Sequence, residues 1–239
     1  MDDVELAVDI GEQAGRLLLG LRNAPAPDRG AEGDRRSHEL ICARLRDERP
    51  DDAVLSEEAV DDPRRLAARR VWIVDLLDGT REFTEPDRTD WAVHVALWES
   101  GRLTAGAVVL PAQGVTLSTR DVRVAAPGPR RLRVVVSRTR PPLVAEAVAQ
   151  SLDAELIALG SAGAKVAAII GGEADVYVHA GGQYEWDSAA PVSVALKAGL
   201  HASRIDGSPL VYNRPDPRLP DLLVCRPELA QTVLAAVRA

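Results

Sequence analysis

Two aspartates, Asp75 and Asp78, stand three positions apart in the middle of the chain. The apolar run 71–74 predicts a buried strand that delivers Asp75 at its end, and Asp78 follows in a turn with Gly79 and Thr80. Carboxylate oxygens are the ligands by which proteins hold Mg²⁺, and the main-chain N–H groups of Gly79 and Thr80 would suit phosphate oxygens. The spacing therefore favours a divalent-cation site that faces a phosphate. The simpler alternative is an Asx turn with a solvated Asp78.

Two further acidic positions strengthen the prediction of a cation site. Glu57 and Glu58 directly follow the apolar pair Val54-Leu55, and Asp187 lies at the start of a predicted helix that Gly199 closes. Taken alone, Asp187 is most simply a helix N-cap. A carboxylate placed there among other carboxylates would be repelled unless a cation joined them, so a metal ion resolves the conflict.

Three segments, 57–58, 72–80 and 186–190, resemble in the same order the motifs of the inositol monophosphatase family, a group of Mg²⁺-dependent, lithium-sensitive phosphatases. The family's strand and turn, Trp-Ile-x-Asp-Pro-x-Asp-Gly-Thr, is similar to residues 72–80, and its helix start, Trp-Asp-x-Ala-Ala, is similar to residues 186–190. The resemblance covers nearly the whole chain. Leu76 stands where the family has proline. Because that side chain is no metal ligand, we expect a change in turn rigidity and retained chemistry.

The resemblance implies a role for each matched residue. The metal ligands for two or three Mg²⁺ ions would be Glu57, Asp75, Asp78, Asp187 and the carbonyl of Leu77. The catalytic residues would be Glu57 and Thr80, which hold the attacking water, and Asp34, which supports Thr80. Because the Thr that the family usually places upstream of Asp34 is missing, Asp34 is equally well a polar residue in the turn before a helix. The implied reaction is hydrolysis of a phosphomonoester.

The residues around these motifs indicate which phosphate ester is bound. Arg81-Glu82-Phe83 resembles the Lys-Glu-Phe or Arg-Glu-Phe of CysQ-type 3′-phosphoadenosine 5′-phosphate phosphatases, and Ser137-Arg138 resembles a Val-Ser-Arg-Ser loop of that subgroup. Arg138 could meet a second phosphate through its planar guanidinium group. Lys165 lies one position later than the lysine of the subgroup's Gly-Ser-Ser-Leu-Lys pattern, which leaves its role open. The substrate-binding set is therefore Asp78, Gly79, Thr80, Arg81, Ser137, Arg138, Gly160, Ser161, Lys165 and Asp187.

The resemblance implies an enzyme that removes the 3′-phosphate of 3′-phosphoadenosine 5′-phosphate, giving AMP and phosphate, as part of sulfur assimilation. Inositol 1-phosphate or fructose 1,6-bisphosphate is the alternative substrate. A haloacid-dehalogenase-type phosphatase, which forms an aspartyl phosphate, is disfavoured because its aspartates stand two positions apart, whereas Asp75 and Asp78 stand three apart. A regulatory protein that keeps the metal site without turnover is a further alternative.

The elements that must position these residues follow from the hydrophobic pattern. Apolar residues at three- and four-residue steps predict a helix over the first twenty-odd residues, which the run Ala24 to Gly30 ends. Ser37 is the predicted N-cap of a second helix that stops before Pro50. A short strand, Val54-Leu55, is predicted within the segment Ala53 to Ser56. The other predicted strands of the first half, separated by Gly, Pro or charged turns, indicate a sheet with antiparallel pairs, and they are Val71–Val74, Trp91–Trp98, Leu103–Leu110, Val115–Thr119 and Leu132–Val136.

The second half alternates strands with helices. Its predicted strands are Glu155–Leu159, Val176–Val178 and Leu222–Cys225, and its predicted helices are Leu143–Ser151, Ala162–Ile170, Ser188–Ala198 and Glu228–Val237. A Pro-Gly-Pro linker near 126–131 separates an N-terminal α+β part, residues 1–128, which carries most metal ligands, from a C-terminal α/β part, residues 129–239, which completes the active site. The fold class is α/β (α+β), and the resemblance implies a layered α-β-α-β-α sandwich.

Composition limits the partners of the chain. With 239 residues, 46% of them hydrophobic, the chain can build a large core, and a net charge of −7 disfavours a nucleic acid polymer as partner. No apolar stretch reaches the roughly 18–20 residues of a membrane span, and the acidic start is unlike a secretory signal, so we expect a cytoplasmic protein with a small-molecule phosphate ester as substrate. A homodimer is a possible assembly. Cys42 and Cys225 are expected to be packed thiols, and His94, His179 and His201 packing or surface residues.

Overall fold

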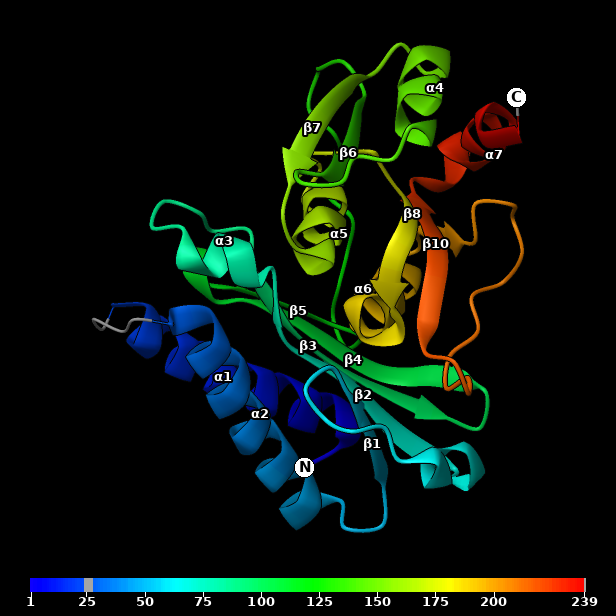
Figure 1. Ribbon diagram of the computed structural model, residues 1–239. Coiled ribbons are helices and arrows are strands. Elements are labelled where there is room, and N and C mark those ends of the chain that lie inside the picture. The colour runs from blue at the N-terminus through cyan, green and yellow to red at the C-terminus, as the bar shows by residue number, and fades with distance from the viewer. Residues whose placement is uncertain (24–27, 239) are drawn as a thin grey trace.

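The protein forms five alternating layers of helices and sheets in the computed structural model, which describes residues 1–23 and 28–238. Figure 1 shows two long N-terminal helices, a first sheet, two central helices, a second sheet and two outer helices near the C-terminus. The predicted α-β-α-β-α sandwich is confirmed. No helix in the described part of the chain is long and apolar enough to cross a membrane.

Helices α1 (Asp3–Asn23) and α2 (Arg29–Glu48) cover the outer face of the first sheet (Figure 1). α1 follows the predicted periodicity and packs Leu6, Ile10 and Leu18 into the core beneath it. α2 begins earlier than predicted because Asp28 caps it, accepting a hydrogen bond from the Ala31 N–H at 3.3 Å. The Ala-Pro-Ala-Pro break predicted between the two helices falls at 24–27, outside the described residues.

Ser37 lies inside α2, so its predicted role as an N-cap is wrong. The residue is fully buried, and its hydroxyl donates to the Leu76 carbonyl at 2.9 Å. A hydroxyl at this position therefore ties α2 to the segment that carries Asp75 and Asp78. The predicted cap position is wrong because the true N-cap, Asp28, lies next to the proline-rich break, where the start of a helix is hard to locate from sequence.

The first sheet contains β1 (Ala53–Ser56), β2 (Arg70–Asp78), β3 (Ala92–Glu99), β4 (Arg102–Leu110) and β5 (Val115–Ser118), in that spatial order. The neighbours β2-β3, β3-β4 and β4-β5 pair antiparallel, as predicted, whereas β1 pairs with β2 in parallel. The short helix α3 (Thr80–Thr84) follows β2 directly, and two 3₁₀ turns, η1 (Pro63–Ala67) and η2 (Pro111–Gln113), connect strands.

A bulge near the end of β2 decides where its aspartates point. Asp75 lies opposite His94 of β3, whereas Asp78 lies opposite Ala92, so β2 has one more residue than β3 in this stretch. Since alternate residues of a strand share a face, His94 and Ala92 share one, and so do their partners. Asp75 and Asp78 therefore reach the same side of the sheet although they stand three positions apart.

The second sheet is built from β6 (Arg133–Ser137), β7 (Glu155–Leu159), β8 (Val176–Tyr184), β9 (His201–Ser203) and β10 (Arg218–Cys225), in the order β7-β6-β8-β10-β9. β6 runs parallel to β7 and β8, whereas β10 runs antiparallel to β8 and β9. The prediction that groups the strand Leu132–Val136 with the antiparallel strands of the first half is therefore wrong, because β6 pairs with strands of the second half. β7 has its predicted bounds, whereas β8 continues past the predicted end at Val178 to Tyr184.

Four helices accompany the second sheet. Helices α5 (Ala162–Ile170) and α6 (Glu185–Lys197) lie between the two sheets, and α4 (Val144–Ser151) and α7 (Ala230–Arg238), the latter preceded by the 3₁₀ turn η3 (Pro227–Leu229), lie on the outer side (Figure 1). α5 has its predicted bounds, and α6 starts at Glu185, ahead of the predicted Ser188.

One hydrophobic core fills the space between the two sheets. It combines side chains of the first half, such as Ile73, with side chains of the second half, such as Val135 and Ala190. α6 approaches β4 closely because Gly106 leaves room there: a Cβ at this position would lie 1.9 Å from the Ser193 Oγ. The two halves thus share an interior, and the division into parts 1–128 and 129–239 stays a prediction. Both cysteines are free thiols.

Candidate active site

The end of β2 opens into a polar cavity of about 510 Å³ between the two halves of the molecule. The cavity is lined by Glu57, Asp75, Leu77, Asp78, Gly79, Thr80, Arg81, Glu82, Ser137, Arg138, Thr139, Arg140, Gly160 and Asp187. We call Glu57, Asp75, Asp78 and Asp187 the carboxylate floor, and Arg81, Arg138 and Arg140 the arginine rim. The structure brings all the predicted metal ligands together here, whereas Asp34, Ser161 and Lys165 lie behind the lining and contact it.

Burial and neighbouring negative charge raise the pKa of three residues of the carboxylate floor, Asp75, Asp187 and Glu57. Asp75 is 1% exposed, and burial followed by the charge of Asp78 raises its pKa well above the usual value. Burial and the charge of Asp78 raise the pKa of Asp187 to about 7. Glu57 stays accessible at the cavity mouth, yet desolvation by surrounding protein and the charge of Asp187 raise its pKa to about 8. The floor is therefore short of positive charge, which a divalent cation would supply.

The turn after Asp75 is held in place by hydrogen bonds. The Leu77 N–H donates to Asp75 Oδ1 at 3.2 Å, and the Thr80 hydroxyl donates to the Leu77 carbonyl at 3.1 Å. Leu76, which replaces the family's proline, is fully buried, and Ser37 binds its carbonyl. The oxygens of this turn and of the neighbouring carboxylates form the hard donor set that Mg²⁺ prefers, so the residues present fit such an ion.

Asp78 is held from the side of α5. Ser161 caps α5, with its Oγ accepting from the Ala164 N–H at 3.1 Å and donating to Asp78 Oδ2 at 2.5 Å. The Gly163 N–H donates to the same oxygen at 3.2 Å, and His94 Nε2 of β3 lies 3.4 Å from it. Protein groups therefore surround one oxygen of Asp78 and leave the other for a ligand. Sequence reasoning gave Ser161 a substrate contact, and its hydroxyl is instead engaged with Asp78.

Lys165 lies behind the 160–161 loop and outside the cavity lining. Its side chain is buried, donates to the carbonyls of Gly160 and Ser161, and lies 5.3 Å from the ring centroid of Tyr177. Burial lowers the pKa of Lys165 to about 8. The Gly160 N–H donates to Asp90 Oδ2 at 2.6 Å, so the loop is held from both ends. A direct contact between Lys165 and substrate stays a prediction that this placement does not favour.

Asp34 lies within α2, and the alternative of a turn before the helix is wrong. Burial followed by the charge of Glu58 raises the pKa of Asp34 to about 7, and a hydrogen bond with the Thr80 hydroxyl partly offsets the rise. Asp34 Oδ1 is buried without a hydrogen-bond partner. The structure thus places Asp34 beside Thr80, as the family resemblance implies.

Of the three guanidinium groups of the arginine rim, that of Arg138 is paired with carboxylates, whereas those of Arg81 and Arg140 have no ion-pair partner among the described residues. Arg138 donates through Nε to Glu82 at 2.9 Å and through Nη2 to Glu85 at 2.7 Å. Arg140 lines the same cavity, and no carboxylate within residues 1–23 and 28–238 lies at ion-pair distance from it. Sequence reasoning chose Arg138 and missed Arg140, although both stand in the loop that follows β6.

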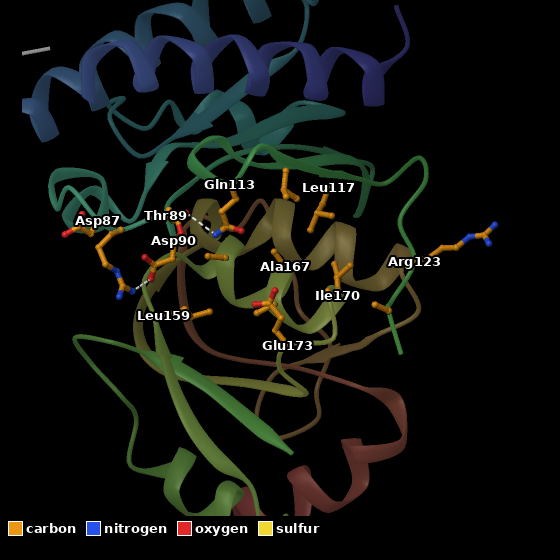
Figure 2. Close-up of a pocket in the computed structure, with 16 residues that line it drawn as sticks. Asp87, Thr89, Asp90, Gln113, Leu117, Arg123, Leu159, Ala167, Ile170 and Glu173 are labelled. Carbon is orange, nitrogen blue, oxygen red and sulfur yellow. Dashed lines mark hydrogen bonds and ion pairs between the residues drawn. The ribbon is translucent and has the colours of Figure 1, made fainter. Parts of the chain in front are cut away.

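A second cavity of about 550 Å³ lies on the far side of segment 87–90, between α5 and β5 (Figure 2). Ile170 of α5 and Leu117 of β5 are among its apolar walls, and Asp90 lies at its edge. Because Asp90 also accepts the hydrogen bond from the Gly160 N–H, this cavity borders the scaffold behind the carboxylate floor. The acidic residues of the floor belong to the first cavity alone among the described linings.

The five layers define the chain as a layered α/β protein of the kind found in metal-dependent phosphatases. The solved structure of CysQ from Bacteroides thetaiotaomicron, a bacterial member of the inositol monophosphatase family, matches with a TM-score of 0.81 and 27% identity over 94% of this chain and 97% of that one. The sequence description of the inositol monophosphatase family matches residues 23–239. The chain belongs to the inositol monophosphatase family, whose enzymes are metal-dependent.

Two mycobacterial proteins are similar to the chain over most of their length. The 3′-phosphoadenosine 5′-phosphate phosphatase of Mycobacterium leprae is 50% identical, and the match covers 100% of this chain and 94% of that protein. The protein with the same name from Mycobacterium bovis is 53% identical over 94% of this chain and 89% of its own length.

Proposed function

We propose that the protein hydrolyses the 3′-phosphate of 3′-phosphoadenosine 5′-phosphate and releases AMP and phosphate. The observation that carries the proposal is the convergence of the carboxylate floor on one cavity, in a chain about half identical to two proteins named for this activity. The reaction would be attack of water on phosphorus, assisted by bound cations. A role in sulfur assimilation is the expected setting.

The floor would hold two or three Mg²⁺ ions through Glu57, Asp75, Asp78, Asp187 and the Leu77 carbonyl. Bound Mg²⁺ supplies acidification of the attacking water and stabilisation of the charge that develops on the phosphoryl and leaving oxygens. Glu57 and Asp187 would then stay ionised at neutral pH, since positive charge offsets the desolvation and repulsion that raise their pKa values. Lithium sensitivity is expected from the same site.

The protein's own groups would orient the water and the phosphate. The Thr80 hydroxyl donates to the Leu77 carbonyl in this structure and lies beside Asp34. For a relay it would turn from that carbonyl to donate its proton to Asp34, whose pKa is about 7, and would accept a proton from the attacking water in return. The main-chain N–H groups of Gly79 and Thr80 would bind phosphate oxygens. Gly79 adopts a φ of +87°, a conformation that favours glycine, and this shapes the turn that presents both groups to the cavity.

Arg140 is better placed than Arg138 for a second phosphate. Glu82 and Glu85 already offset the charge of Arg138, whereas Arg140 faces the cavity without such a partner among the described residues. A guanidinium group can bind a phosphate through two parallel hydrogen bonds. Arg140 would therefore favour a nucleoside bisphosphate over a monophosphate ester, with Arg138 fixed in a supporting position.

Phosphate release from three esters tests the proposal. 3′-Phosphoadenosine 5′-phosphate, inositol 1-phosphate and fructose 1,6-bisphosphate are compared with Mg²⁺, with EDTA, and with Mg²⁺ plus Li⁺. We expect the nucleotide to lead in kcat/KM by about tenfold or more, which is about 1.4 kcal/mol of transition-state discrimination. If inositol 1-phosphate or fructose 1,6-bisphosphate has the highest kcat/KM, the proposed substrate is wrong and the proposed metal site stands. Absence of Mg²⁺-dependent release from every ester would favour the regulatory-protein alternative.

A further inference from the structure

One oxygen of Asp78 is enclosed by groups from β3 and α5, as the contacts of Ser161, Gly163 and His94 show. We propose that His94 is a positioning residue that fixes Asp78 Oδ2 against the start of α5 and so leaves the other oxygen of Asp78 for Mg²⁺. This role rests on the proposed function of Asp78 as a metal ligand. His94 itself is assigned no contact with substrate.

The burial of His94 makes its contact with Asp78 specific. The His94 side chain is 0% exposed and has two polar neighbours among the described residues, the Asp78 carboxylate and the main chain of Trp186. The Asp78 carboxylate is the one acidic group of these residues within 4.0 Å of the ring. A buried polar nitrogen is costly without such a contact, so the ring and the carboxylate gain from being held together.

Gly163 provides the space in which the His94 ring lies. A Cβ at position 163 would lie 2.3 Å from His94 Nε2 and 2.8 Å from Val108 Cγ1. Glycine therefore lets α5 bring its N–H group to Asp78 while the imidazole ring occupies the same corner. His94 and Gly163 are complementary parts of one support for the carboxylate.

A direct bond between His94 and a metal is the competing interpretation. Asp75, Asp78 and His94 offer ligand atoms that lie within 4.8 Å of one another. A nitrogen ligand would suit Zn²⁺ better than Mg²⁺. Ser161 Oγ and the Gly163 N–H, however, already donate to the Asp78 oxygen that faces His94, so that oxygen is occupied by protein donors. The geometry favours support of the carboxylate.

Direct Mg²⁺ binding, measured by isothermal titration calorimetry without substrate, tests the role of His94. His94→Leu removes both nitrogens at similar volume, whereas His94→Gln keeps an amide N–H near the position of Nε2. We expect Mg²⁺ binding to weaken about tenfold in the Leu variant and to stay within about threefold in the Gln variant. His201→Leu is the matched control, because His201 Nε2 contacts Ser203 Oγ at 2.9 Å on β9. The control should bind Mg²⁺ as the original protein does.

Steady-state kinetics and Zn²⁺ binding distinguish a positioning role of His94 from direct metal ligation. The Mg²⁺ concentration for half-maximal phosphate release should rise in His94→Leu, with kcat at saturating Mg²⁺ changed less than about threefold. Unchanged Mg²⁺ binding in a folded Leu variant would overturn the proposal. So would loss of Zn²⁺ binding with Mg²⁺ binding retained, because His94 would then be a direct ligand.

Two further results are informative. If His94→Leu does not fold, His94→Asn replaces it, since its shorter amide cannot reach Asp78, and equal Mg²⁺ affinity of the Asn and Gln variants would refute the positioning role. If the original protein binds no Mg²⁺, the proposed metal site fails and the role of His94 fails with it. A preference for a different phosphate ester changes only the proposed substrate, because the calorimetry contains none.

Discussion

The carboxylate floor and the arginine rim of the same cavity differ in how firmly the surrounding protein holds their side chains. Asp75 and Asp78 stand at the bulged end of a central strand, and Ser161 and Gly163 hold the Asp78 carboxylate in one orientation. Arg140, in contrast, is exposed in the loop after β6, and its side chain has no carboxylate partner among the described residues. The difference indicates that the fold determines where the carboxylates lie, whereas under the proposed function the choice of substrate would rest on exposed charges such as Arg140, which can be exchanged without unfolding the protein.

Removing one charge from the floor should have the largest effect. In Asp75→Asn we expect Mg²⁺-dependent phosphate release to fall about 1,000-fold or more, which is about 4 kcal/mol of transition-state stabilisation. Because burial and the charge of Asp78 raise the pKa of Asp75, the metal-free variant should resist urea at least as well as the original protein. Steady-state kinetics and urea unfolding in EDTA measure the two effects.

Glu58→Gln is the control for the loss of a floor charge. Glu58 is the exposed neighbour of Glu57 and lies outside the cavity lining. The activity of Glu58→Gln should therefore stay within about threefold of that of the original protein. If the Asp75→Asn variant keeps a tenth of the original turnover, Asp75 is not an essential metal ligand. The proposed difference between the carboxylate floor and the arginine rim would then be wrong.

Substitutions in the arginine rim should change the selectivity among substrates and leave the hydrolytic step unchanged. Arg140→Ala should raise KM for 3′-phosphoadenosine 5′-phosphate about 10- to 100-fold, because a charge-assisted contact with the second phosphate is lost. KM for adenosine 3′-phosphate, which lacks that phosphate, should change less than about threefold. Arg138→Ala is the matched control, since its charge is already offset by Glu82 and Glu85. Equal losses on both nucleotides in Arg140→Ala would contradict the assignment.

The floor could be predicted from the sequence because its signals are local. Asp75 and Asp78 have a characteristic spacing beside an apolar run, and Asp187 begins a helix with small residues. The same kind of signal gave the bounds of β7 and α5, whose flanking turns are short. Local patterns therefore predicted carboxylates that meet in the central cavity, whereas the layered architecture was implied by the family resemblance.

The rest depends on contacts between segments that are far apart in the sequence. Ser37 looked like a helix cap, but it binds the carbonyl of Leu76 on another element. Arg138 looked available for a phosphate, but α3 and the residue after it supply Glu82 and Glu85 as its partners. Lys165 looked like a substrate contact, but packing buries it behind the 160–161 loop. Such pairings follow from tertiary packing and leave no periodic trace in the sequence.

The pH dependence of stability should distinguish the floor from the rim in the metal-free protein. Folding raises the pKa of Asp187 from 3.8 to about 7 and that of Glu57 from 4.5 to about 8, so the folded state binds more protons than the unfolded state between these values. The resulting stabilisation is complete below about pH 4 and is lost as the pH rises through 7 to 8. We expect the free energy of unfolding to fall by about 1–2 kcal/mol between pH 5 and pH 8, with solvent screening of Glu57 limiting its share.

Urea unfolding in EDTA at several pH values measures this slope. Saturating Mg²⁺ should flatten the slope, because a bound cation replaces the protons on the floor. Arg140→Ala should keep the slope or steepen it slightly, because the charge of Arg140 lowers the pKa of Asp187, whereas Asp187→Asn should reduce the slope. Stability that rises between pH 5 and pH 8 in EDTA would show that the floor carboxylates are not destabilised by folding.

The smallest expected effect concerns the support beneath the floor. Ser37→Ala removes the hydroxyl that donates to the Leu76 carbonyl at 2.9 Å and leaves that carbonyl buried without this partner, which should lower the free energy of unfolding by about 1–2 kcal/mol. Ser151→Ala is the matched control, because its hydroxyl makes a bond of 2.9 Å to the Val148 carbonyl at the accessible end of α4, and it should cost less than about 0.5 kcal/mol. Since Leu76 adjoins Asp75 and Leu77, Ser37→Ala should weaken Mg²⁺ binding slightly and leave the preference among phosphate esters unchanged. A shift in that preference would mean that α2 acts on the rim as well as on the floor, so that the two regions are not independent.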